Sequence, residues 1–180
     1  MPLPVAHSLV GASVAAAIDG RPQSWWKLLC IGAFLAVFPD SDYILNWLRI
    51  GWGGWHHGFT HSFVFALFAG AVTMLITRSR SIKTFIAFSA ATASHAVLDY
   101  LITESRGIAL FWPFTDHRYK LKIPNPINYT WSKTSFWDTA VDVLVICLTE
   151  LIIFAPLLLL VMLLRIMSIR KGKLLHGMDH

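Results

Sequence analysis

The chain contains little cysteine, few acidic residues and no internal repeat. Its two cysteines, Cys30 and Cys147, both lie inside apolar segments. This disfavours a disulfide framework or a cysteine-ligated metal site, and we expect both side chains to pack as small apolar residues. The formal net charge is +5, but the basic residues gather at the ends of apolar segments. That placement is typical of membrane topology and predicts no nucleic-acid partner.

Apolar residues are abundant, at 56% of the 180 residues with a mean hydropathy of +0.58. Soluble domains contain about 45–50% by a similar count, so the composition predicts an integral membrane protein. The length fits one membrane-embedded domain over residues 1–180. We predict an all-α fold: a polytopic membrane helical bundle of about four to five helices with a polar metal site near the outer membrane face. The predicted helices cover residues 7–19, 25–38 with a weaker continuation to 48, 61–77, 82–102, and 136–165 with a kink at Pro156.

The basic residues also predict an orientation. Nine of the fifteen Lys and Arg fall on one side of the predicted bundle: Arg21, Lys27, Arg78, Arg80, Lys83, Arg165, Arg170, Lys171 and Lys173. By the positive-inside rule this side is cytoplasmic, which predicts a multi-pass protein of the bacterial inner (cytoplasmic) membrane with a cytoplasmic C-terminus. The aromatic-rich segment 103–135 would then lie at the outer interface.

Ionisable residues in four predicted helices fall at a common depth. Counted from the basic end of each helix at about 1.5 Å per residue, all lie roughly 20–26 Å along it: His7, Asp40, His61, His95 and Asp99. The hydrocarbon core is about 30 Å thick, so this level is the outer third of the membrane. Isolated charges there are costly and usually face one another or water. Imidazoles together with carboxylates are the ligand set of zinc and similar divalent metals.

The histidine spacing agrees with a shared site. His57 and His61 are four residues apart, as are His95 and Asp99, so each pair would share a helix face. Either pair alone is weak support for a metal site, and the case depends on their combination with the other segments. We interpret His56 as a solvated neighbour of the site.

Two carboxylates flank a helix break. Pro39 disrupts the helical hydrogen bonds, and the loosened backbone lets Asp40 and Asp42 both turn inward. The predicted metal ligands are His7, Asp40, Asp42, His57, His61, His95 and Asp99, and Asp42 is also the predicted catalytic residue. A shared aspartate would allow one to three ions, most simply Zn²⁺. Three acidic residues of the last helix stay open as further members of the site: Asp138, Asp142 and Glu150.

Five motifs occur in order: an N-terminal histidine (His7), PDSD (39–42), HHGFTHS (56–62), SHAVLDY (94–100) and FWPF (111–114). In this combination the chain resembles the YdjM-like family of membrane-bound metal-dependent hydrolases, which is distantly similar to zinc-dependent phospholipases C. The resemblance covers residues 7–114. It implies a helical metallohydrolase in which Asp99 bridges metal ions.

The leading functional hypothesis is hydrolysis of a phosphoester in a phospholipid or lipid-linked substrate by metal-activated water. Asp42 or Glu150 would accept the proton, and the basic loop residues Arg106, Arg118 and Lys120 would hold an anionic headgroup. The alternative is a non-enzymatic divalent-metal carrier or channel, although such proteins often carry internal repeats that this chain lacks. A third hypothesis is a metal that only stabilises the bundle. The sequence leaves the oligomeric state open.

Overall fold

The computed structural model describes residues 3–19, 25–48, 56–102, 106–121, 123 and 135–176. Its elements are α1 (Pro4–Ile18), α2 (Trp25–Val37), η2 (Phe38–Ser41), α3 (Asp42–Trp47), η3 (Phe59–His61), α4 (Phe63–Ile76), α5 (Ile82–Ile102) and α6 (Phe136–His176). Within these residues the fold has no strand, and β pairing is limited to one isolated bridge between Ile108 and Tyr119. The all-α prediction is confirmed.

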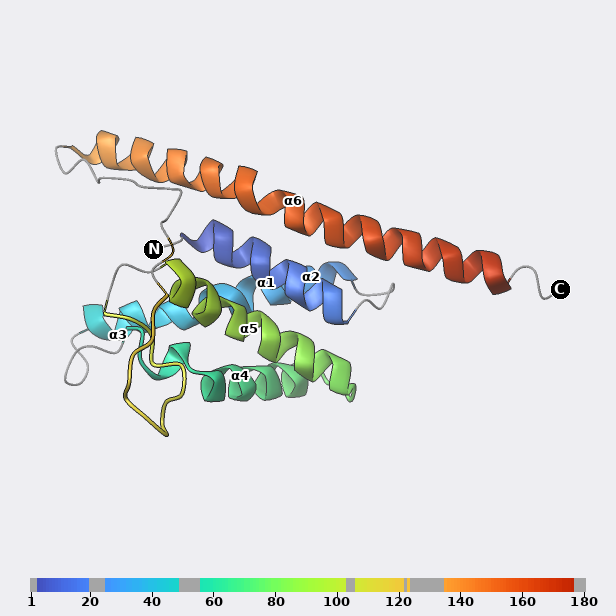
Figure 1. Cartoon of the computed structure of the whole chain (residues 1–180), viewed down its shortest axis with the longest axis horizontal. Coiled ribbons are helices and arrows are strands. Elements are labelled where there is room, and N and C mark those ends of the chain that lie inside the picture. Colours follow the sequence, from blue (N-terminus) through green and yellow to red (C-terminus); the bar gives the residue numbers. More distant parts are fainter. Residues whose placement is uncertain are drawn as a thin grey trace.

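Helix α1 lies at the centre of the bundle. It packs against α2, α5 and α6, while α5 also contacts α2 and α4. Figure 1 shows α6 along one side of the bundle, with its C-terminal part extending beyond the other helices, and α4 on the opposite side. The apolar core between α1, α2, α4 and α5 is built around Leu35, Phe88 and Ala91. The helices that carry the predicted ligands are therefore in mutual contact.

Small residues bring these helices close together. A Cβ atom on Gly32 of α2 would lie 2.8 Å from the carbonyl oxygen of Gly11 in α1. A Cβ atom on Gly70 of α4 would lie 2.8 Å from the backbone nitrogen of Ser89 in α5. Close approach through small residues is the usual packing mode in a bilayer, where lipid tails are as apolar as the helices. The tight crossings fix α1 and α5, which carry His7 and His95.

Two helices are long and apolar enough to cross a membrane: α5 over 21 residues and α6 over Phe136–Lys171. α1 and α4 are shorter apolar helices. Large apolar side chains point outward around the bundle, such as Phe34 at 64% and Phe68 at 63% exposed. Such a surface is suited to lipid contact, as the predicted membrane bundle requires.

The ends of α1, α4 and α6 differ from the prediction, and α1 begins at Pro4 instead of residue 7. Helix α4 begins at Phe63 instead of residue 61, because Ser62 is its N-cap and its hydroxyl accepts a hydrogen bond from the Phe65 backbone nitrogen (3.1 Å). The last helix runs to His176 and continues through Pro156. The predicted loop 103–135 is described only in part, and Arg21 lies outside the described residues.

Candidate metal centre

Four donor atoms meet at the end of the bundle where α1 begins and α5 ends: Oδ1 of Asp40, Nε2 of His61, Nε2 of His95 and Oδ2 of Asp99. His61 Nε2 lies 3.0 Å from His95 Nε2, 3.5 Å from Asp40 and 3.5 Å from Asp99. His95 Nε2 lies 3.4 Å from Asp40 and 3.3 Å from Asp99. Ligands about 2.0–2.1 Å from a tetrahedral ion are roughly 3.3–3.4 Å apart. These residues fit a tetrahedral divalent ion.

Hydrogen bonds on the far side of each imidazole orient the two central histidines. His95 Nδ1 lies 2.6 Å from the Ala36 carbonyl oxygen, to which it can only donate. The Thr60 hydroxyl donates to Asp42 Oδ2 (2.7 Å), so it accepts from Nδ1 of His61 (2.9 Å). Both Nδ1 atoms are thus protonated, and in the neutral rings both Nε2 lone pairs face each other. This arrangement requires a positive charge, a proton or a metal ion, between them.

Asp99 lies between histidines from three segments. Its Oδ1 is 3.6 Å from His7 Nε2, and its Oδ2 is 3.7 Å from His57 Nε2. Within the described part of the chain, both Asp99 oxygens, both His7 ring nitrogens and Asp40 Oδ1 are buried without a hydrogen bond. Buried polar atoms are nearly always satisfied in native proteins. These atoms therefore mark a place for a ligand that the polypeptide does not supply.

His57 lies in the cluster, but the backbone that positions it differs from the predicted helix. It adopts a left-handed backbone conformation with φ of 62°, and His61 belongs to η3, so the two do not share the face of one helix. The His57 carbonyl accepts from the Ala109 nitrogen (3.1 Å) and from Arg118 Nη1 (3.3 Å). Burial, with His56 and His61 adding to it, lowers the pKa of His57 to about 3. The imidazole is therefore neutral, as metal ligation requires.

A second metal-capable group contains Asp40, Asp42 and His56. His56 Nδ1 lies 2.9 Å from Asp42 Oδ1 and 3.9 Å from Asp40 Oδ1. The interpretation of His56 as a solvated neighbour is wrong: its side chain is only 15% exposed, and its ring centroid is 3.9 Å from those of Tyr43 and His57. Asp40 belongs to both groups, and Pro39 lies in the 3-10 turn η2 that carries it.

Glu150 has a different position from the predicted ligands. Its Oε1 accepts from the Leu3 backbone nitrogen (2.5 Å) and its Oε2 from the Ala6 nitrogen (3.0 Å). It therefore caps the N-terminus of α1, where the positive end of the helix dipole favours a carboxylate. A third metal-capable group contains His56, His57 and His61, and among the described residues none of the three groups contains Glu150, Asp138 or Asp142.

Residues 106–121 cover the cluster. Ile108, Ala109 and Leu110 are buried, and the Leu110 carbonyl accepts from the Phe63 nitrogen (3.0 Å). Three aromatic residues of this segment are exposed: Phe111, Trp112 and, at 84%, Phe114. Arg118, predicted to hold a headgroup, donates to two backbone carbonyls, those of His57 and Gly107 (both 3.3 Å). The segment is thus fixed to the cluster and presents apolar rings outward.

Sequence reasoning missed two residues of this site, His56 and Thr60. A signal for His56 was present, because it precedes His57 directly and a single tight turn brings both rings to the same cluster. Thr60 carried no signal of its own, since its role depends on Asp42, which is 18 residues earlier.

The described helices form a bundle with an apolar outer surface, which is typical of a membrane protein, and its buried His/Asp cluster could hold a metal ion. The comparisons identify the family: the sequence model of the YdjM inner membrane protein family matches residues 1–173, and the chain belongs to this family. The resemblance seen in the sequence motifs is confirmed. The chain is also similar to inner membrane protein YbcI of Escherichia coli (strain K12), at 28% identity over 127 residues that cover 66% of this chain and 72% of the relative. No solved structure matches the chain.

Proposed function

We propose that this protein is a membrane-embedded metal-dependent hydrolase that cleaves a phosphoester of a phospholipid or lipid-linked substrate. The observation that carries the proposal is the buried donor set of Asp40, His61, His95 and Asp99, whose spacing fits a tetrahedral ion. Further potential ligands surround this set: His7, His57, Asp42 and His56. The proposed site therefore holds one to three ions. Zn²⁺ is the proposed metal because nitrogen and oxygen ligands in a tetrahedral arrangement suit it.

A divalent ion in such a site lowers the pKa of water from about 15.7 toward 7 and polarises phosphoryl oxygens. The chain itself supplies orientation and proton acceptance. Ala36 and Thr60 hold the His95 and His61 rings in place through their Nδ1 atoms. Asp42 is the proposed proton acceptor, and His56 relays the proton: its Nδ1 bonds to Asp42, while its Nε2 is buried without a hydrogen bond among the described residues.

The position of the cluster supports a lipid substrate. It lies at one end of the helices, under a segment with exposed aromatic rings, and the basic residues of the α4–α5 turn lie at the other end. We propose that the cluster faces the outer side of the inner membrane and that the C-terminus is cytoplasmic. A phospholipid ester lies near this depth, so substrate would enter sideways from the bilayer. Arg106 and Lys120, both exposed, are the proposed contacts for its headgroup.

The test begins with full-length protein purified in detergent. Metal content is measured by mass spectrometry before and after chelation and zinc reloading, and phospholipid turnover is followed by lipid mass spectrometry. We expect turnover that depends on metal and is lost in His95→Ala. His95→Gln, whose side-chain amide N–H can still donate to the Ala36 carbonyl oxygen, is the matched control for folding.

The outcomes separate the hypotheses. Protein that stays metal-free after zinc exposure refutes the proposal. Hydrolysis of a soluble phosphodiester without lipid turnover refutes the lipid assignment. Metal flux in proteoliposomes without hydrolysis identifies a carrier, and loss of folding in both His95 variants identifies a structural metal.

A further inference from the structure

A cavity lies at the opposite end of the helices from the metal centre, between α2 and the turn that joins α4 to α5. Its volume is about 320 Å³. The residues that line it are Lys27, Leu28, Ile31, Thr77, Arg78, Ser79, Thr84 and Phe88. Helix α4 (Phe63–Ile76) lies between His61 and Arg78 in the chain, and its length corresponds to roughly 20 Å. The metal centre and this cavity are therefore separate sites.

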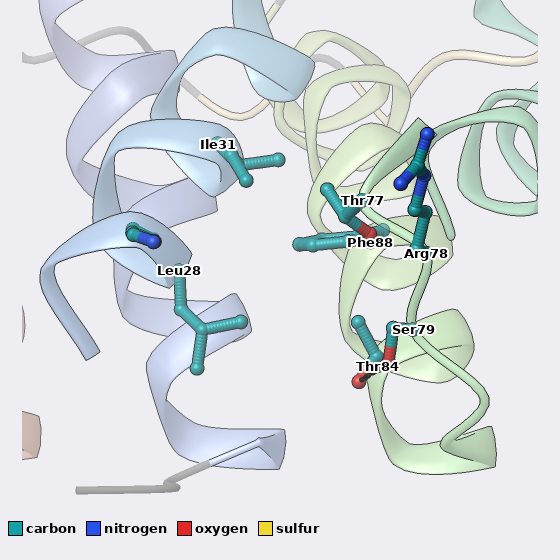
Figure 2. Close-up of a pocket in the computed structure, with 8 residues that line it drawn as sticks. Leu28, Ile31, Thr77, Arg78, Ser79, Thr84 and Phe88 are labelled. Carbon is teal, nitrogen blue, oxygen red and sulfur yellow. Dashed lines mark hydrogen bonds between the residues drawn. The ribbon is translucent and has the colours of Figure 1, made fainter. Parts of the chain in front are cut away.

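The cavity has an apolar wall and a polar rim. Figure 2 shows Leu28 and Ile31 of α2 on one side, and Phe88 of α5 with Thr77 on the other. Arg78, which is exposed, and Ser79 also line the cavity, in the turn after α4. Such a cavity suits an amphiphile, a polar group joined to a short apolar stretch.

The described lining carries two positive charges and no negative charge. Lys27 is exposed, with its Nζ 5.7 Å from the Trp26 ring centroid, a pairing common where membrane meets water. Arg78 is exposed and has a left-handed φ of 52°, an uncommon backbone conformation for a residue other than glycine. Asp19 lies behind the lining, where its Oδ2 accepts a hydrogen bond from Thr84 (2.7 Å).

The hydroxyl groups of the cavity form an ordered chain. Ser79 donates to Thr84 (2.9 Å), and Thr84 donates in turn to buried Asp19. Asp19 is 1% exposed and accepts a hydrogen bond from Thr84, so Thr84 separates this carboxylate from the opening. The charge presented at the opening is that of Arg78 and Lys27.

We propose that this cavity binds the headgroup of an anionic phospholipid. Basic pockets between membrane helices recognise anionic headgroups, and the volume is within the range of about 300–1,000 Å³ that is usual for ligand sites. Arg78 and Lys27 would contact the phosphate, and Leu28, Ile31 and Phe88 the first methylene groups of the chains. The proposal is independent of the hydrolase proposal, because the two sites are at opposite ends of the bundle.

Lipid binding is measured on the full chain in detergent by native mass spectrometry, with phosphatidylglycerol, phosphatidylcholine and inorganic phosphate as the probes. We expect bound phosphatidylglycerol in preference to phosphatidylcholine, and weakening of about 10- to 100-fold in Arg78→Gln, the range for one lost charge-assisted contact. The matched control is Arg80→Gln, which removes the same charge from the same turn but does not line the cavity. Its affinity should stay near that of the wild type.

Three results would overturn the proposal. Equal weakening in Arg78→Gln and Arg80→Gln means diffuse surface attraction. Inorganic phosphate that competes as well as the lipid means a small-anion site. Undiminished lipid binding in Ile31→Trp, which fills the cavity without changing charge, means that the lipid binds elsewhere; this variant also decides the matter if Arg78→Gln does not fold.

Discussion

Glu150 connects the last helix to the start of the first, and replacing it by alanine tests how α1 is held. The carboxylate is 1% exposed and accepts hydrogen bonds from the Leu3 and Ala6 nitrogens. Hydrogen bonds to charged groups contribute about 1.5–3 kcal/mol each, so losing two costs about 3–6 kcal/mol. At roughly 2–4 °C per kcal/mol for a chain of this size, Tm should fall by roughly 6–24 °C.

The assay is thermal unfolding of purified protein in detergent, for the wild type, Glu150→Ala and Glu150→Gln. The glutamine keeps the shape and one acceptor oxygen, so its Tm should lie between the other two. Because His7 directly follows Ala6, we also expect Glu150→Ala to retain less metal. A wild-type Tm for Glu150→Ala refutes the capping argument, and a wild-type Tm combined with complete metal loss would show that Glu150 is itself a ligand.

Three further substitutions test the packing and the site. Thr60→Val removes the hydroxyl between Asp42 and His61 and should weaken metal affinity about 10- to 100-fold. Thr60→Ser keeps the hydroxyl and should keep the affinity. Equal affinities of the two variants in titrations against a competing chelator would contradict this role. Gly70→Ala places a methyl group against Ser89 and should destabilise the bundle by about 1–3 kcal/mol in thermal unfolding, and an unchanged Tm would mean that the crossing relaxes freely. Arg165→Met removes the guanidinium that donates to the last-turn carbonyls of α1 and should lower Tm with metal content unchanged; loss of metal would contradict a role confined to that end.

The positions of the helices, and the depth of polar residues along them, could be predicted from the sequence. The predicted bounds of α5, residues 82–102, match the structure because a long apolar run ends in polar residues on both sides. The depth argument also placed His7, Asp40, His61 and Asp99 at one level, and the structure brings them together. The rise per residue is a fixed local property of a helix. The depth of a residue therefore follows from counting positions in a single sequence.

The connections between the helices were not readable in the same way. The helical pairing of His57 with His61 is wrong because Ser62, one residue later, is an N-cap and the preceding residues form a turn. The same turn brings His56 to Asp42, a contact between residues 14 positions apart that no local pattern encodes. Glu150 stayed open as a member of the site, and its actual partner could not be predicted, because that partner is the backbone at the start of another helix.

The cap that Glu150 places on α1 also has a consequence for biosynthesis. The N–H groups beside His7 receive their acceptor from a residue made 143 positions after it. A nascent chain that has inserted α1 to α5 already contains every predicted ligand. Its first helix still lacks the Glu150 carboxylate that caps it. Release of α6 from the ribosome is therefore the step that supplies the α1 cap, and we expect chains stopped before it to hold His7 less firmly.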